Sequence, residues 1–207
     1  MDIRQSYDSA AEAYAKHLAD ELAQKPLDRH LLNRFAEEVR GKGRVADLGC
    51  GPGHVTRYLH EQGVSMLGID LSEQMIDVAR RLNPGIDFRA GDMARLDLPD
   101  GALAGAVLFY SIVHFAPAEL DAVLLELRRV LTVGGAALIS FHIGDEVVHV
   151  EDLFGSAVDL DFRFHDPGKV VAALQRAKLQ VREHVEREPY DGAEYPSRRC
   201  YLLVRAV

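Results

Sequence analysis

The stretch Val45-Ala46-Asp47-Leu48-Gly49-Cys50-Gly51-Pro52-Gly53 decides the fold of this chain. Its first half reads as a buried strand and its second half as a glycine-rich turn, and an apolar helical pattern follows. A strand, a tight glycine turn and a helix bring backbone N–H groups against a cofactor, because glycine has no Cβ. Asp47 sets this loop apart from an ordinary dinucleotide loop, since its carboxylate repels a pyrophosphate and attracts an ammonium or sulfonium group.

Strands and helices alternate along the rest of the chain. Predicted strands cover 44–48, 64–69, 86–90, 103–109, 136–141, 179–185 and 200–204, and predicted helices cover 54–62, 72–82, 117–131 and 167–177. Residues 7–40 read as a helical lead-in, and residues 159–165 alternate as a short extended piece that shapes a pocket. This order predicts an α/β fold with a doubly wound sheet. We expect a single domain over 1–207, with a lead-in (1–40), a cofactor-binding core (41–141) and substrate-side elements with the C-terminal strands (142–207).

Three further motifs follow the opening stretch in order: Gly68-Ile69-Asp70-Leu71-Ser72, Gly91-Asp92-Met93 and Phe109-Tyr110-Ser111. Together the four motifs resemble those of class I S-adenosylmethionine (SAM)-dependent methyltransferases, and the resemblance covers about residues 7 to 207. It implies a Rossmann-like sheet of seven strands, mostly parallel, with the last strand antiparallel at or near one edge. It also implies SAM as cofactor, S-adenosylhomocysteine as product, and no metal.

The cofactor-binding residues follow from these motifs. Asp70 ends the second predicted strand, where a carboxylate accepts hydrogen bonds from both ribose hydroxyls, although NAD folds share its spacing from the glycine loop. The resemblance assigns Asp92 and Met93 to the adenine, and the loop with Asp47 to the methionine end. An aromatic of the lead-in often closes the site in this family. The predicted cofactor-binding set is Tyr14, Asp47, Gly49, Cys50, Gly51, Gly53, Asp70, Leu71, Asp92, Met93 and Tyr110, with the Cys50 thiol as a space-filler.

The acceptor side is expected after the fourth strand, because ligands of open α/β sheets bind outside the carboxyl ends of strands. Methyl transfer to a hydroxyl or an ammonium also needs a base, and His114 is the best-placed candidate for a base or orienting group. The alternative is that His114 is a hydrogen-bonded core residue. Further candidate substrate contacts are Tyr7, Ser111, His142, Tyr190, Arg198 and Arg199, although 186–199 also fits a solvated hairpin.

Composition limits the classes of partner. The net charge of −8, from 24 basic and 32 acidic residues, argues against binding to nucleic acid or an anionic membrane. The strand end 109–112 also lacks the Asn/Asp-Pro-Pro-aromatic element of nucleic-acid amino methyltransferases. The first residues show no apolar signal core, and the two cysteines are far apart, so we expect a cytoplasmic protein. The expected oligomeric state is a monomer or a homodimer. The acids and histidines of 142–152 match no compact metal spacing.

The sequence therefore predicts a methyltransferase that moves the methyl group of SAM to a small-molecule acceptor by in-line displacement. An NAD-dependent oxidoreductase is the first alternative, although His54 stands where that fingerprint needs Gly or Ala. The second alternative is a SAM-binding protein without turnover. A macromolecular acceptor also stays open.

Overall fold

The computed structural model describes all residues, 1–207, and contains a seven-stranded sheet in the order β3-β2-β1-β4-β5-β9-β8. The strands are β1 (Arg44–Leu48), β2 (Ser65–Asp70), β3 (Asp87–Ala90), β4 (Leu103–Phe109), β5 (Leu131–His142), β8 (Leu179–Arg187) and β9 (Arg199–Ala206). Neighbouring strands are parallel except that β9 is antiparallel to both β5 and β8. The predicted doubly wound sheet, with its last strand antiparallel near one edge, is confirmed.

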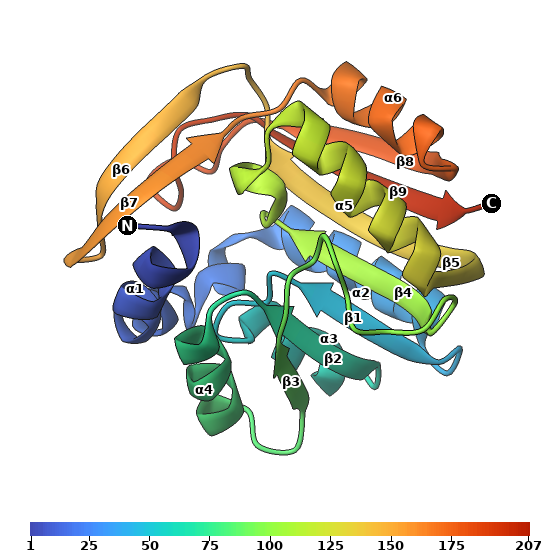
Figure 1. Ribbon diagram of the computed structural model, residues 1–207, viewed down its shortest axis with the longest axis horizontal. Helices are drawn as coiled ribbons and strands as arrows, with labels where there is room; N and C mark the ends of the chain where they lie inside the picture. The colour runs from blue at the N-terminus through green and yellow to red at the C-terminus, as the bar shows by residue number, and fades with distance from the viewer.

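Helices cover both faces of this sheet (Figure 1). They are α1 (Ile3–Leu18), α2 (Pro26–Val39), α3 (His54–Glu61), α4 (Glu73–Leu82), α5 (Pro117–Val130) and α6 (Pro167–Arg176). The larger core cluster lies between the sheet and α5 with α6, and a second cluster lies between the other face and α2 with α3. Leu120, Val123, Leu124 and Leu127 form the buried stripe of α5, as their helical spacing predicts. None of the helices combines the length and the apolar character needed to cross a bilayer.

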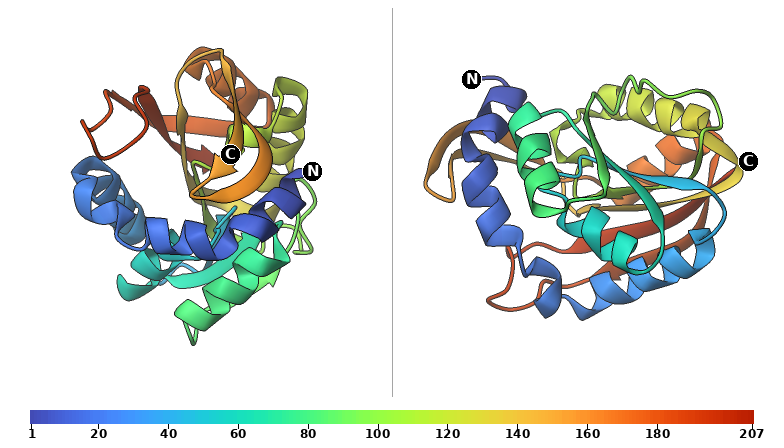
Figure 2. Two further views of the ribbon diagram at one scale, coloured as in Figure 1. Left: turned by 90° about the vertical axis from the view of Figure 1, so that its left-hand side faces the viewer. Right: turned by 90° about the horizontal axis from the view of Figure 1, so that it is seen from below.

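The helical lead-in consists of two α-helices. Between α1 and α2 lies a short 3₁₀ helix, η1 (Glu21–Gln24), and Pro26 occupies the first turn of α2. The small residues Ala11 and Ala15 of α1 pack against Met75 and Val78 of α4. Helix α1 therefore lies beside α4, at the edge of the sheet where β1, β2 and β4 end (Figures 1 and 2).

A hairpin that the sequence reading did not predict in full covers the same edge. Strands β6 (Val147–Leu153) and β7 (Ser156–Arg163) pair with each other outside the main sheet and arch over α1 (Figures 1 and 2). The predicted extended piece at 159–165 is largely β7. The even-numbered residues of this segment face inward: Val158 and Leu160 pack on Ala10 of α1. Residues of β6 alternate between exposed and half-buried, and Val150 and Leu153 pack against the same cluster.

Candidate active site

The backbone N–H groups of the glycine loop after β1 are already hydrogen-bonded within the protein. The N–H groups of Gly49 and Cys50 both donate to the carbonyl of Ile69 (2.8 and 3.1 Å). The N–H of Gly51 donates to Oδ2 of Asp70 (2.8 Å), and that of Gly53 donates to the Cys50 carbonyl (3.0 Å). These N–H groups therefore already have partners within the protein. A dinucleotide loop needs free N–H groups to hold pyrophosphate, so this loop lacks the donors for that task.

Asp47 lies behind the loop, at the N-terminus of α3. It is 2% exposed, and its Oδ2 accepts a 2.6 Å hydrogen bond from the hydroxyl of Thr56 in the first turn of that helix. The carboxylate opposes the positive end of the helix dipole, where a phosphate binds in dinucleotide folds. Burial raises the pKa of Asp47 to about 6, although the Thr56 hydrogen bond acts in the opposite direction.

This burial makes Asp47 a cost to stability at neutral pH. A carboxyl whose folded pKa is raised favours the folded state while protonated, so the penalty is absent below the unfolded pKa of about 3.9 and complete above the folded pKa of about 6. The shift of roughly two pH units corresponds to a penalty on the order of 3 kcal/mol. We expect Asp47→Asn to stabilise the protein without ligands by about 1–3 kcal/mol at pH 7 and by much less at pH 4.

Urea unfolding of Asp47→Asn at the two pH values measures this effect. The matched control is Asp77→Asn on α4, whose exposed carboxylate is 3.4 Å from Arg80 and which should change stability by about 0.5 kcal/mol or less. A variant less stable than wild type at pH 7 would contradict the prediction.

Asp70 ends β2 beside the loop and organises two turns. Its Oδ2 accepts from Gly51 N and its Oδ1 from Ser72 N (2.9 Å), while Ser72 itself caps α4 by accepting from Met75 N. Burial raises the pKa of Asp70. Each carboxylate oxygen keeps a second lone pair, so the group can still accept further hydrogen bonds.

The residues predicted around the adenine lie at the same edge. Leu71 follows Asp70 and is exposed, and Asp92 is exposed with its Oδ1 accepting from Ala94 N at 2.8 Å. Met93 is half-buried, and its Cε lies 3.0 Å from where a Cβ on Gly49 would be. The structure thus brings the ends of β1, β2 and β3 together around one loop.

The surface of the glycine loop has the features of a ligand cradle. A Cβ on Gly51 would meet only the ring of Tyr14, at 3.7 Å, so space remains between loop and ring. Ser111 lies over Gly49, and its Oγ is buried without a hydrogen-bond partner. An orphaned hydroxyl beside an open glycine is the arrangement expected where a polar ligand supplies the missing partner.

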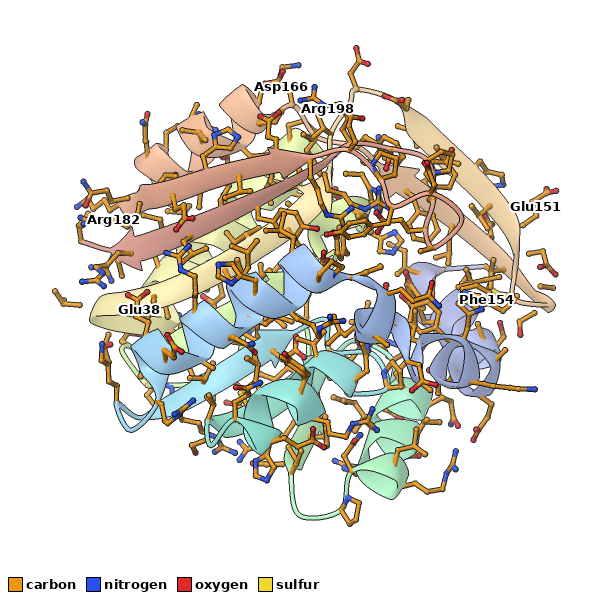
Figure 3. The ribbon with its side chains drawn as sticks, turned by 180° about the vertical axis from the view of Figure 1, so that it is seen from behind. Glu38, Glu151, Phe154, Asp166, Arg182 and Arg198 are labelled. Carbon is orange, nitrogen blue, oxygen red and sulfur yellow. The ribbon has the colours of Figure 1, made fainter.

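Tyr7 and Tyr14 of α1 lie between the glycine loop and His114, which follows β4. Their rings are edge to face with centroids 5.9 Å apart, and the Tyr7 hydroxyl is 2.7 Å from Nε2 of His114. His114 belongs to the short 3₁₀ helix η2 (Ile112–His114) after β4. Phe154, in the turn between β6 and β7, packs on Tyr14 and stacks on His17, and Figure 3 shows it over α1. The lead-in therefore covers the site together with the hairpin.

His142, at the end of β5, forms a second aromatic corner of the site. Its ring lies 5.1 Å from that of Phe164 and 5.3 Å from that of Tyr110, and its Nδ1 is 2.7 Å from Ser197 Oγ. Burial, with the charges of Arg199 and Lys25 nearby, lowers the pKa of His142 to about 3, so the ring is neutral at pH 7. The Tyr110 hydroxyl turns away into a buried network and bonds Tyr201 at 2.6 Å, so Tyr110 offers the site only its ring.

The candidate substrate contacts from 186–199 have hydrogen-bond or ion-pair partners within the scaffold. The Tyr190 hydroxyl accepts from Leu27 N (3.1 Å) at the start of α2, which has no side-chain cap of its own. Arg199 is 2% exposed and bonds the carbonyls of Tyr195 and Ser197. Arg198 is exposed and pairs with Glu186 and Glu188, and Figure 3 shows it on the outer surface. The structure does not bring these three residues to the glycine loop.

Sequence reasoning missed a buried charged network between the lead-in and this segment. Its members are Glu21, Lys25, Asp28, Arg187, Glu194 and Arg199, joined by ion pairs. His54, at the start of α3, pairs with Glu21 at 2.9 Å. The only sequence signal was a charge-rich start of α2, because ion pairs between distant segments leave no periodic pattern.

The Cys50 thiol and metal binding complete the list of predicted features. Cys50 is 3% exposed and packs with Ile76, Ala79 and Phe88, and burial raises its thiol pKa well above the usual value, so it fills space as predicted. No group of three or more His, Cys, Asp or Glu side chains is placed to hold a metal ion.

Comparison with known proteins finds a family match over the part of the chain that contains the glycine loop. Residues 45–135 match the methyltransferase domain family. The chain is 36% identical over 97 residues to malonyl-[acyl-carrier protein] O-methyltransferase of Serratia marcescens, which covers 47% of this chain and 37% of that protein. The chain spans about a quarter to three fifths of the length of the curated relatives it matches.

Solved structures share the fold at low sequence identity. A SAM-dependent methyltransferase from Methanosarcina mazei superposes with a TM-score of 0.75 at 16% identity, over 84% of this chain and 97% of that chain. Geranyl diphosphate C-methyltransferase from Streptomyces coelicolor, solved with Mg²⁺, geranyl diphosphate and S-adenosylhomocysteine, gives 0.69 at 14% identity, over 88% and 78%. A further neighbour is a [4+2]-cyclase, with a TM-score of 0.73 at 19% identity over 99% and 95%, so the fold alone does not fix the chemistry.

Proposed function

Residues 45–135 match the methyltransferase domain family, and on this premise we propose that the chain is a class I SAM-dependent methyltransferase that transfers the methyl group of SAM to a small-molecule acceptor. The Serratia marcescens and Streptomyces coelicolor proteins are named for O- and C-methyl transfer, respectively. The proposal extends the shared reaction, and neither of those substrates, to this chain.

The single observation that carries the proposal is the state of the glycine loop. Its N–H groups are used internally, and Asp47 occupies the helix end that would otherwise attract phosphate. Such a loop favours a ligand whose charged end is positive and which carries no phosphate. SAM carries ammonium and sulfonium groups and no phosphate, whereas NAD carries a pyrophosphate that this loop has no free donors to hold.

We assign different residues of the site to different parts of the cofactor. We assign the methionine end to the loop Gly49–Gly53 with Asp47 behind it, the ribose to Asp70, and the adenine to Leu71, Asp92 and Met93. Tyr14 covers the loop, and Tyr110 contributes its ring. When bound, SAM supplies an electrophilic methyl carbon, and the enzyme's task is to align the acceptor with it.

The acceptor pocket is assigned to the space between His114 and His142. Tyr7, Ser111 and His142 are its polar members, and His114 stands behind the Tyr7 hydroxyl. Phe162 and Phe164 line it because both lie on the inward face of the segment that follows Leu160. The free, buried cysteines support a reducing compartment such as the cytoplasm, and the net charge of −8 supports a small molecule over nucleic acid. A monomer or a homodimer is proposed.

Calorimetric titration with SAM, S-adenosylhomocysteine, NAD⁺ and NADH tests the cofactor. We expect micromolar binding of the SAM pair alone, about −8 kcal/mol. Asp70→Asn keeps one acceptor oxygen for the loop but loses the charge, and should weaken binding of the SAM pair by roughly 10- to 100-fold. The exposed Asp77→Asn variant serves again as the matched control and should bind SAM normally.

Each other outcome has a distinct meaning. Binding of the nicotinamide pair instead would overturn the methyltransferase proposal. Binding of the SAM pair without methyl transfer to any of a panel of small acids, phenols and amines would favour the alternative of a SAM-binding protein without turnover.

A further inference from the structure

His114 has no nitrogen available for an acceptor. Its Nδ1 lies 2.9 Å from the carbonyl oxygen of Asp161 in β7, and its Nε2 lies 2.7 Å from the Tyr7 hydroxyl. A carbonyl can only accept, so Nδ1 carries the proton of the neutral ring. Nε2 then carries no proton, and its lone pair accepts a hydrogen bond from the Tyr7 hydroxyl. The tautomer of His114 is fixed by two elements that are distant from it in sequence.

The environment keeps this histidine neutral. Burial lowers the pKa of His114, and the ring of Phe162 lies 5.1 Å away. A neutral ring with a fixed tautomer is a proton acceptor at Nε2, but only toward the group already bound there. That group is the phenol of Tyr7.

Tyr7 lies between His114 and the glycine loop. Its ring packs edge to face on Tyr14, which covers Gly51. The phenol has one O–H, which it donates to His114, and two lone pairs, which remain free. Toward the site, Tyr7 can therefore act only as a hydrogen-bond acceptor.

We propose that Tyr7 takes the proton of the methyl acceptor and passes its own proton to His114, so that His114 acts through Tyr7 and never touches the acceptor. This rests on the proposed function. The acceptor atom X forms its bond to the methyl carbon while the carbon–sulfur bond breaks, and the electron pair of that bond goes to sulfur. The proton of X–H moves to Tyr7 Oη, the former Tyr7 proton moves to Nε2, and the imidazolium formed is held at Nδ1 by the Asp161 carbonyl.

The relay also selects the acceptor class. An acceptor must present an O–H or N–H group to the free lone pairs of Tyr7, as alcohols, phenols and amines do. An ionised carboxylate has no such hydrogen, and its oxygens would face the lone pairs of Tyr7. The carboxyl methylation implied by the name of the Serratia marcescens relative is therefore not the reaction inferred for this chain.

Kinetics with a panel of phenols, primary amines and carboxylic acids tests the relay. Turnover is expected with phenols or amines and absent with the acids. Tyr7→Phe keeps the ring and should lower kcat by roughly 10²- to 10⁴-fold, with the calorimetric affinity for SAM changed less than about twofold. His114→Gln should lower kcat similarly, and the double variant should be no worse than either single variant, because the two residues act as a unit. The matched control is Tyr58→Phe on α3, which removes a hydroxyl bonded to Asn33 of α2.

A spectroscopic measurement gives a readout that does not depend on turnover. In the ¹⁵N spectrum of the protein with S-adenosylhomocysteine, His114 should be neutral with its proton on Nδ1, and Tyr7→Phe should shift the Nε2 resonance alone. A proton on Nε2 would overturn the relay. Additive losses in the double variant, full kcat in Tyr7→Phe or turnover with carboxylic acids only would overturn it while leaving methyl transfer intact. SAM binding without turnover on the whole panel would overturn both proposals.

Discussion

Replacing Gly49 by alanine is expected to lower SAM affinity by at least about 100-fold, or 2.7 kcal/mol. Gly49 has φ +76°, and an added Cβ would lie 2.4 Å from Cβ of Ser111 and 3.0 Å from Cε of Met93. The first contact involves a short side chain tied to the backbone after β4, so the glycine loop and that backbone must separate. The loop would lose the cradle shape on which cofactor binding depends. Calorimetric titration with SAM measures the loss.

Stability should fall as well, and a second glycine isolates the cause. A left-handed conformation costs an alanine roughly 1–2 kcal/mol, and the clash adds roughly 1–3 kcal/mol in a packed site. Gly85, in the exposed turn after α4, has φ +94° with nothing within 4 Å of its would-be Cβ. Gly85→Ala should therefore show the conformational cost alone and bind SAM normally.

A double variant tests whether Ser111 is the obstacle. Ser111→Gly removes the atom that the new Cβ would meet, and the remaining contact is to a flexible methionine end. We expect Gly49→Ala with Ser111→Gly to recover most of the affinity that the single glycine variant loses, when each is measured against Ser111→Gly. An unchanged SAM affinity in Gly49→Ala would contradict the role given to the loop.

The sheet and its helices could be predicted because their signals are local. The strand at 103–109 is apolar throughout and becomes the fully buried β4, and the stripe of α5 has the spacing of a helix against a sheet. Motif order then placed Asp47, Asp70 and Asp92 at adjacent strand ends, because parallel strands end at the same edge.

Features that join distant segments could not be predicted in this way. The donor state of the glycine loop depends on the carbonyl of Ile69 in β2, and the tautomer of His114 depends on Asp161 in β7. The structural use of Tyr190 and Arg199 depends on α2 and on the turn that precedes β9. Residue type and spacing identify such side chains as polar or aromatic, but they do not identify their partners.

Replacing Arg187, at the end of β8, by methionine is expected to lower the stability of the protein far more than the same change at the exposed Arg198. Its guanidinium is 2.9 Å from Asp28 Oδ2 and from the Tyr201 hydroxyl, and it also pairs with Glu194. The side chains of Asp28 and Glu194 are 0% and 3% exposed. Arg187→Met preserves much of the apolar stem but leaves the buried Asp28 without its ion-pair partner, while Glu194 keeps Lys25 and Arg199. Removing one partner of a buried ion pair costs about 3–5 kcal/mol, and we expect a loss of that size in urea unfolding at pH 7.

Arg198, an exposed arginine that also forms ion pairs, is the control that distinguishes the effect of burial from the effect of charge. Arg198 pairs with Glu186 and Glu188 while its side chain is 52% exposed, so Arg198→Met should cost about 1 kcal/mol or less. The Arg187→Met penalty should shrink as pH falls toward about 4, because protonation of Asp28 removes the uncompensated charge, and burial already raises the pKa of Asp28 in the wild type. Equal losses in the two variants, or a pH-independent loss in Arg187→Met, would mean that the network contributes only packing. A larger and pH-dependent loss at Arg187 alone would show that buried charge pairing holds the lead-in to the strands behind the acceptor pocket.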